Sequence, residues 1–87
     1  MIIQDSDPSN IARLRWQCRR GMLELDVLLE AFLKQHYVAL SPRLKRHFVQ
    51  LLELPDPIIH AWCVQGQQPE DEAFAELIAS IRATRVA

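Results

Sequence analysis

Prolines and glycines divide this chain into short segments, and the division limits what the chain can fold into. Five prolines and two glycines separate segments whose apolar residues recur at helical spacing. Proline breaks a helix interior and glycine readily ends a helix, so each segment can form only a short helix. No segment reads convincingly as a strand. The sequence therefore predicts an all-α fold, a compact bundle of five short helices joined by tight turns.

The first two predicted helices meet at a glycine. Asp7 and Ser9 are candidate caps for the first helix, and Gly21 can end it in a left-handed conformation at no steric cost. The second helix runs from Met22 to His36, and its wide apolar stripe is typical of a central helix. The stripes expected to face the core comprise Ile11, Leu14 and Cys18, then Leu25, Leu28, Leu29, Phe32, Leu33 and His36.

A polar cap followed by proline marks the start of the next two helices. Ser41 precedes Pro42, and Asp56 precedes Pro57, so each proline would occupy the first helical position. The fifth helix starts with acids after Pro69, where the helix dipole favours negative charge. The residues expected to face inward are Leu44, Phe48, Leu51, Leu52, Ile58, Ile59, Trp62, Cys63, Phe74, Leu77, Ile78 and Ile81.

Chain length limits both the domain count and the kind of site. We expect a single domain over residues 1–87, with its core at about residues 10–84. A domain of this size buries a modest fraction of its surface, so a deep, enclosed active site is hard to accommodate. A surface that acts on a larger partner is the easier design.

The sequence also favours a cytoplasmic protein. The opening "MIIQDSDPSN" lacks the basic region and long apolar run of a signal peptide, and no apolar stretch approaches the length of a membrane span. Cys18 and Cys63 do not form a disulfide framework. We expect reduced thiols and no membrane insertion.

Residues for metal binding or catalysis are scattered along the chain. His60 and Cys63 are spaced to share one helical face, but a structural zinc site needs four ligands and the other candidates stand singly. No Ser or Cys lies in a glycine-rich elbow, and no glycine-rich loop could cradle a phosphate. We therefore predict no metal site, no catalytic residue and no enzyme activity.

A small helix-turn-helix-like nucleic-acid-binding or regulatory protein is the alternative. Basic clusters such as "RLRWQCRR" and "PRLKRH" would suit phosphate contacts. Against this, the net charge is −1, and no helix rich in Arg, Asn or Gln follows a turn. We expect no nucleic-acid partner.

The segment "CRRGMLELD" places charge around one of the two glycines. If the first helix ends at Gly21, Arg20 would project from a rigid corner and Glu24 would lie in the first turn of the next helix. If the helix instead continues through Gly21, Arg20 and Glu24 would form a minor i, i+4 surface pair. Trp16 lies off the apolar stripe and is a candidate exposed anchor, whereas Trp62 is expected in the core.

The same segment resembles the SdhE family, the FAD assembly (flavinylation) factors of succinate dehydrogenase. The family's Arg-Gly-x-x-Glu motif is met by Arg20, Gly21 and Glu24, and the surrounding "WQCRRGMLELD" is similar to the family context. A second block, "LLELPDPIIHAWCVQGQQPEDE", resembles the later family pattern at the expected distance. Pro55 stands where the family often has the first of two acids, which leaves Asp56 alone.

The resemblance implies an assembly factor that binds the flavoprotein subunit of succinate dehydrogenase, and often that of fumarate reductase. Such a factor promotes covalent attachment of FAD to a histidine of its partner, binds no cofactor tightly itself and is expected to be a monomer when free. The resemblance places the partner-binding surface at Arg20, Gly21 and Glu24, with Trp16, Arg19, Met22 and Asp26 around them.

Overall fold

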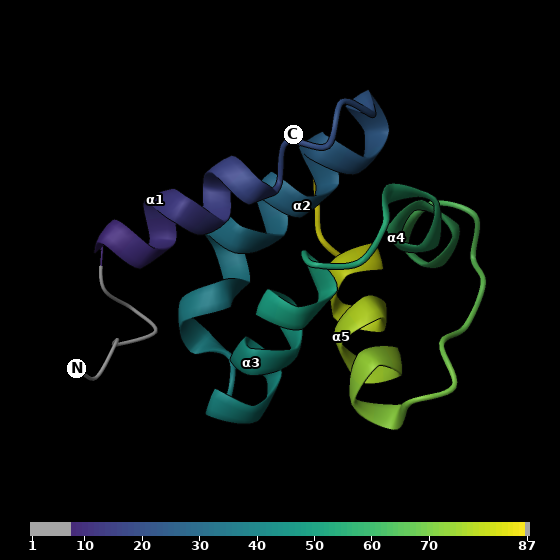
Figure 1. The fold of residues 1–87 in the computed structure, drawn as a ribbon. Coiled ribbons are helices and arrows are strands. Elements are labelled where there is room, and N and C mark those ends of the chain that lie inside the picture. Colours follow the sequence, from purple (N-terminus) through teal and green to yellow (C-terminus); the bar gives the residue numbers. More distant parts are fainter. Residues whose placement is uncertain (1–7, 87) are drawn as a thin grey trace.

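The computed structural model describes residues 8–86, and in this range the chain is helical without strands. The elements are α1 (Pro8–Gln17), α2 (Leu23–His36), the short 3-10 helix η1 (Tyr37–Ala39), α3 (Pro42–Leu51), α4 (Asp56–Cys63) and α5 (Glu72–Arg82) (Figure 1). The predicted all-α fold of five short helices is confirmed. None of the helices in this range is long and apolar enough to cross a membrane.

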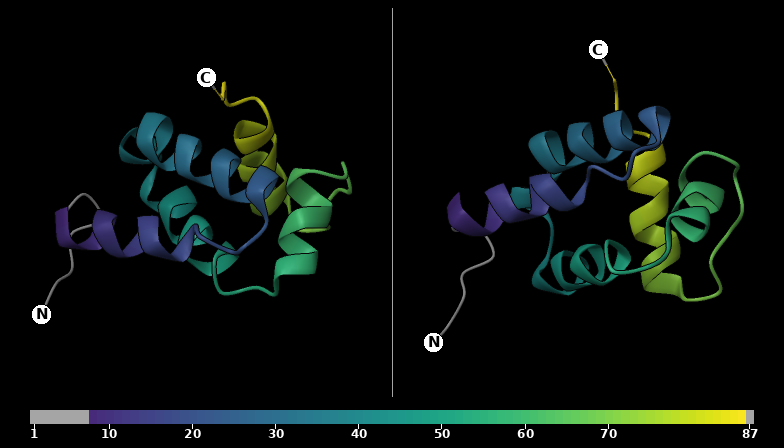
Figure 2. Two further views of the ribbon diagram at one scale, coloured as in Figure 1. Left: turned by 90° about the horizontal axis from the view of Figure 1, so that it is seen from above. Right: turned by 45° about the horizontal axis from the view of Figure 1, so that its top comes forward.

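Helix α5 packs against most of the other helices. It contacts α2, α3 and α4, while α1 packs along α2 (Figures 1 and 2). The fully buried side chains at their meeting point come from every helix and from η1. They include Leu14 of α1 and Cys18 just after it, Leu25, Leu29 and Phe32 of α2, Tyr37 of η1, Phe48 and Leu51 of α3, Ile59 of α4, and Leu77, Ile78 and Ile81 of α5.

Two helix starts are fixed by polar side chains. The Ser41 hydroxyl accepts a hydrogen bond from the Leu44 amide at 3.2 Å, and Pro42 follows as the first residue of α3, as predicted. At α5 the Asp71 carboxylate accepts from the amides of Ala73 at 2.8 Å and Phe74 at 3.1 Å. The acids after Pro69 thus supply the cap of α5.

Other predicted caps are wrong. Helix α4 begins at Asp56 itself and its capping position is Pro55, so Asp56 does not cap the helix. Helix α1 begins at Pro8, which places Ser9 inside the first turn, and Asp7 lies outside the described residues. Proline can stand at a capping position because the amide it lacks would have no partner inside the helix.

Two side chains expected in the core are exposed, and several others, Trp62 among them, are only half-buried. Ile58 and His36 are exposed, and Trp62 is half-buried against Phe74, with 5.7 Å between ring centroids. Each lies at the edge of its helix's apolar stripe. In a bundle of short helices the neighbours cover a narrow strip of each helix, so residues at the edge of a stripe meet solvent.

Candidate partner-binding site

The segment between α1 and α2 makes a sharp corner at a glycine. Helix α1 ends at Gln17, and the Arg19 amide donates to the Trp16 carbonyl at 3.1 Å in the closing turn. Gly21 follows in the connection with φ of +83°, the left-handed conformation expected if the first helix ends there. The helix therefore ends before Gly21 and does not continue through it. Gly21 lies exposed at the corner.

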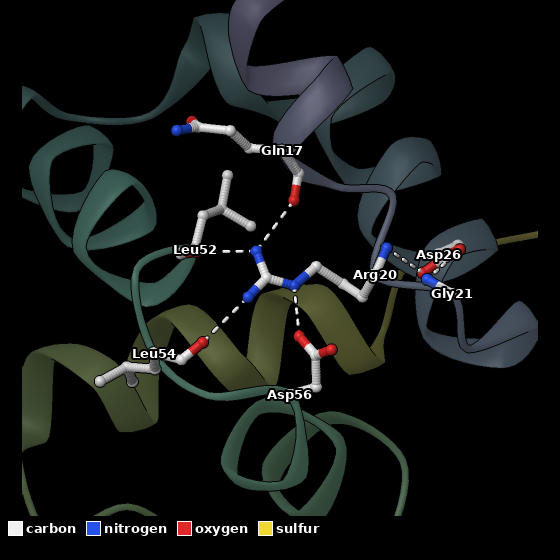
Figure 3. A network of polar contacts seen from close by, with 7 residues as sticks. All are labelled: Gln17, Arg20, Gly21, Asp26, Leu52, Leu54 and Asp56. Atoms are coloured by element: carbon white, nitrogen blue, oxygen red, sulfur yellow. Dashed lines mark hydrogen bonds and ion pairs between the residues drawn. The ribbon is translucent and has the colours of Figure 1, made fainter.

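Arg20 turns inward, contrary to the expectation that it projects from the corner. Its side chain is 17% exposed, and its Nε donates to Asp56 Oδ1 at 2.6 Å as a hydrogen bond and ion pair (Figure 3). One terminal nitrogen donates to the carbonyls of Gln17 at 3.1 Å and Leu52 at 2.8 Å. The other donates to the Leu54 carbonyl at 3.0 Å. Four of the five guanidinium N–H groups are thus directed at the chain itself.

These bonds connect two separate turns of the molecule. Leu52 is the C-terminal cap of α3 and Leu54 lies in the turn before α4. Both carbonyls therefore lack a helical N–H donor, and the Arg20 guanidinium takes the place of that donor. Asp56 lies in the first turn of α4, where the dipole stabilises its charge. Arg20 therefore links the α1–α2 corner to the α3–α4 turn, and Asp56 anchors Arg20 in place of capping α4.

Asp26 holds the other side of the corner. Its two carboxylate oxygens accept from the backbone amides of Arg20 at 2.7 Å and Gly21 at 3.1 Å (Figure 3). These amides precede the capping position of α2, so Asp26 does not cap the helix but joins the connection to its first turns. Met22 also faces inward and packs against the core. Of the seven predicted contact residues, Arg20, Asp26 and Met22 support the corner from within.

The remaining four predicted contact residues are exposed. Trp16 is 71% exposed, with the Arg19 guanidinium 6.0 Å from the centroid of its ring. Glu24 is exposed, and it makes no hydrogen bond or ion pair with any residue in the described part of the chain. A Cβ added at Gly21 would meet no atom within 4 Å. The corner thus offers an open backbone, a free carboxylate and an exposed indole.

The two thiols are unsuited to chemistry at this surface. Cys18 and Cys63 are buried and free. Burial raises the pKa of the Cys18 thiol to about 12, and the Glu30 carboxylate adds to the rise. Burial likewise raises the pKa of Cys63 to about 12, so both remain protonated at neutral pH. Among residues 8–86, no three His, Cys, Asp or Glu side chains are grouped so that they could hold a metal ion.

Comparison with known proteins decides the family. The family described as "Flavinator of succinate dehydrogenase" matches residues 12–85. The chain belongs to this family. It is also 40% identical over 77 residues to the FAD assembly factor SdhE of Coxiella burnetii, covering 88% of this chain and 94% of that protein. Identity to the SdhE of Idiomarina loihiensis is 53% over 66 residues, or 76% of this chain and 73% of the relative.

For this flavinator, membership confirms what the resemblance implied about its general role. The family consists of FAD assembly factors that serve succinate dehydrogenase, and its members are assembly factors and not enzymes themselves. The SdhE of Shewanella oneidensis, 45% identical over 73 residues covering 84% of this chain and 89% of the relative, carries the same description. This assignment selects the assembly-factor prediction over the nucleic-acid-binding alternative.

Sequence reasoning missed two features of the flavinator's surface. The carbonyls that hold Arg20 belong to Leu52 and Leu54, and no residue type marks a backbone acceptor in a sequence. Leu23 and Val27, at the start of α2, are exposed apolar residues one turn apart. Their positions outside the predicted apolar stripe of α2 were the available signal.

Proposed function

We propose that this flavinator binds the flavoprotein subunit of succinate dehydrogenase through the outward face of the α1–α2 corner. Gly21 and Glu24 form the centre of this contact, and Trp16 and Arg19 extend it along α1. Binding promotes covalent attachment of FAD, which the flavoprotein carries as the substrate of the reaction. The flavinator itself contributes no reacting group.

The main support for this proposal is the geometry of Gly21. The corner is exposed, its φ of +83° suits glycine, and the space around it is open. A partner's backbone can therefore approach closely at a point where any side chain would intervene. Glu24, in the first turn of α2, is free to accept from a cation or from backbone amides on that partner.

Arg20 enters this proposal as a positioning residue. Its bonds to Asp56 and to the carbonyls near the α3–α4 turn hold the corner against the body of the protein. Asp26 fixes the amides of Arg20 and Gly21 from the other side. A rigid corner loses little conformational entropy when the partner binds, which favours affinity. Within residues 8–86, one guanidinium N–H of Arg20 makes no hydrogen bond.

A binding protein can accelerate the attachment without chemistry of its own. It can shift the flavoprotein only toward the arrangement that it binds more tightly. Holding the flavin and the residue that it joins in near-attack geometry removes an entropic part of the barrier.

The proposal extends to the setting of the reaction. The flavinator acts as a monomer in the cytoplasm, where the thiols of Cys18 and Cys63 stay reduced. It holds no cofactor tightly, and the flavoprotein subunit of fumarate reductase is a second partner of the same chemistry.

Coexpression of the flavoprotein with flavinator variants tests the contact. Gly21→Asn adds a side chain at the corner while keeping a residue type that tolerates positive φ, and Glu24→Ala removes the free carboxylate. We expect each variant to fold and to lower covalent flavin, scored by in-gel fluorescence, by about tenfold or more. Glu70→Ala, which removes an exposed carboxylate from the α4–α5 connection, is the matched control and should leave flavinylation unchanged.

Two results would overturn the proposal. Folded Gly21→Asn and Glu24→Ala that flavinylate as well as wild type would remove the corner from the contact. Duplex DNA binding with a steep salt dependence, together with unmodified flavoprotein, would favour a nucleic-acid function instead.

A further inference from the structure

An apolar groove lies beside Glu24. It has a volume of about 500 Å³ and runs between the first turns of α2, the end of α4 and the C-terminal segment that follows α5. Its main lining residues are Leu23, Glu24, Val27, Leu28, Val64 and Val86. The groove starts two residues after Gly21, so it adjoins the proposed contact surface.

Apolar side chains around this groove are unusually exposed. Leu23 is 79% exposed and Val86 is 48% exposed, and Val27 lies one turn after Leu23 on the same side of α2. Single apolar residues are common on protein surfaces, but three of them around one hollow form a patch. Such patches mark binding sites because covering them removes apolar area from water.

The wall of the groove formed by the C-terminal segment is held in place. The Gln35 side chain donates to the Arg85 carbonyl at 2.8 Å and thereby joins this segment to α2. Thr84 is buried, and its hydroxyl donates to the Ser80 carbonyl at 3.0 Å. Both bonds hold residues that directly precede Val86, so this wall of the groove is anchored to α2 and α5 as far as Arg85.

Charge at the groove indicates what can occupy it. Glu24 is the only charged residue among those that line it, and no cation in residues 8–86 is paired with Glu24. A twofold contact between two copies of this chain would bring two such carboxylates to one interface, which repel each other. A partner with an apolar side chain and an adjacent cation would satisfy both the patch and the carboxylate.

We infer that the groove receives an apolar side chain from a segment of the flavoprotein subunit, with an adjacent Arg or Lys paired to Glu24. The inference rests on the proposed function and adds a second half to its contact. Gly21 admits the partner's backbone at the corner, and the groove binds the side chain that follows. The groove makes the contact selective for a segment that joins apolar and basic residues.

Binding measurements on surface variants test the groove. Leu23→Glu and Val86→Glu place a carboxylate among the exposed apolar residues, and both sites are open enough for the fold to tolerate it. Val38→Glu is the matched control, because Val38 is 63% exposed in η1 at the opposite end of α2. We expect about tenfold weaker binding of FAD-free flavoprotein by calorimetry for the two groove variants and wild-type affinity for the control.

Photo-crosslinking identifies the occupant. A benzophenone side chain placed at Leu23 should crosslink to a flavoprotein peptide that carries an Arg or Lys beside an apolar residue. A crosslink to a second copy of the flavinator, or to a peptide without a cation, would overturn the inference. So would wild-type affinity in both groove variants.

The variants distinguish an error in the assignment of the groove from an error in the proposed function. If Gly21→Asn and Glu24→Ala lower flavinylation while Leu23→Glu and Val86→Glu bind normally, the groove is excluded and the corner stands. If all four variants bind and flavinylate as wild type, both assignments fall.

Discussion

Arginine suits position 20 because its planar guanidinium reaches several acceptors at once. The acceptors are the Asp56 carboxylate and three backbone carbonyls that come from two different turns. Lysine carries the same charge on a single nitrogen and cannot span this set. The motif residue that looked most suited to a partner is therefore largely occupied within its own chain.

Replacing Arg20 should lower stability as well as function. Arg20→Lys keeps the charge but leaves partly buried carbonyls unsatisfied, so we expect the free energy of unfolding to fall by about 2 kcal/mol. Urea denaturation followed by circular dichroism measures the change. Arg46→Lys, on the exposed surface of α3, is the control and should shift the free energy by less than about 0.5 kcal/mol. Equal midpoints for wild type and Arg20→Lys would contradict the inward role of Arg20.

The buried thiols predict a loss of stability at alkaline pH. The pKa of Cys18 is raised from 9.0 to about 12 in the folded protein, so the unfolded chain loses this proton first. The stability linked to the raised pKa is fully present below pH 9.0 and is lost as the pH rises toward 12. The loss for one thiol amounts to about 1.4 kcal/mol per pH unit within that window.

Comparison with Cys18→Ala isolates this effect from other groups that titrate at high pH. We expect the free energy of unfolding of wild type to fall more steeply above pH 9.0 than that of Cys18→Ala, by the slope of one thiol. Chemical denaturation at about pH 9, 9.5 and 10 provides the two slopes. Parallel slopes would show that Cys18 ionises as readily folded as unfolded.

At the scale of the elements, α5 depends on its N-terminal cap. The helix contacts three others, and the Asp71 carboxylate bonds two of its first amides. The bond from the Phe74 amide, followed by that from Ala73, holds the pKa of Asp71 below its usual value of 3.8. The stability linked to this lowered pKa is present above pH 3.8 and is lost as the pH falls through the folded pKa.

Removing the cap should loosen the whole bundle. We expect Asp71→Ala to lower the melting temperature at pH 7 by several degrees, because two amides of the first turn lose their acceptor. Asp71→Asn, which keeps an oxygen acceptor without the charge, should lose less. Differential scanning calorimetry checks the order, and Glu70→Ala is the neighbouring control. Equal melting temperatures for Asp71→Ala and wild type would show that the cap is dispensable.

At the scale of the whole molecule, the sequence predicted most features that depend on local chemistry. Prolines, the Ser41 cap and helical spacing indicated the five helices, and the conformational freedom of glycine indicated the corner at Gly21. These features depend on neighbouring residues, which a sequence displays directly. The family's motif also marked the segment that the proposed contact uses.

Features that depend on distant pairing could not be predicted in the same way. Arg20 and Asp56 are 36 residues apart, so their contact depends on how the helices pack. Asp56 before Pro57 matched a capping pattern, but tertiary structure gave its carboxylate a different partner. The exposure of Leu23 has the same cause, because it depends on which helices fail to cover the start of α2.

The three histidines of the chain allow a test of whether the flavinator contributes a reacting group. His36, His47 and His60 lie on α2, α3 and α4. Within residues 8–86, none of them is grouped with Asp, Glu, Cys or other His side chains in a way that could hold a metal ion. If the flavinator acts by positioning its partner, none of these imidazoles transfers a proton during FAD attachment.

A variant that replaces all three histidines with glutamine should therefore keep its activity. We expect covalent flavin within about twofold of wild type across pH 6 to 8, because none of the three imidazoles takes part in the reaction. The control is the Glu24→Ala variant, which should lose flavinylation at every pH in that range. A loss of about a hundredfold in the folded triple variant would assign the flavinator an acid–base role and contradict a purely positional mechanism.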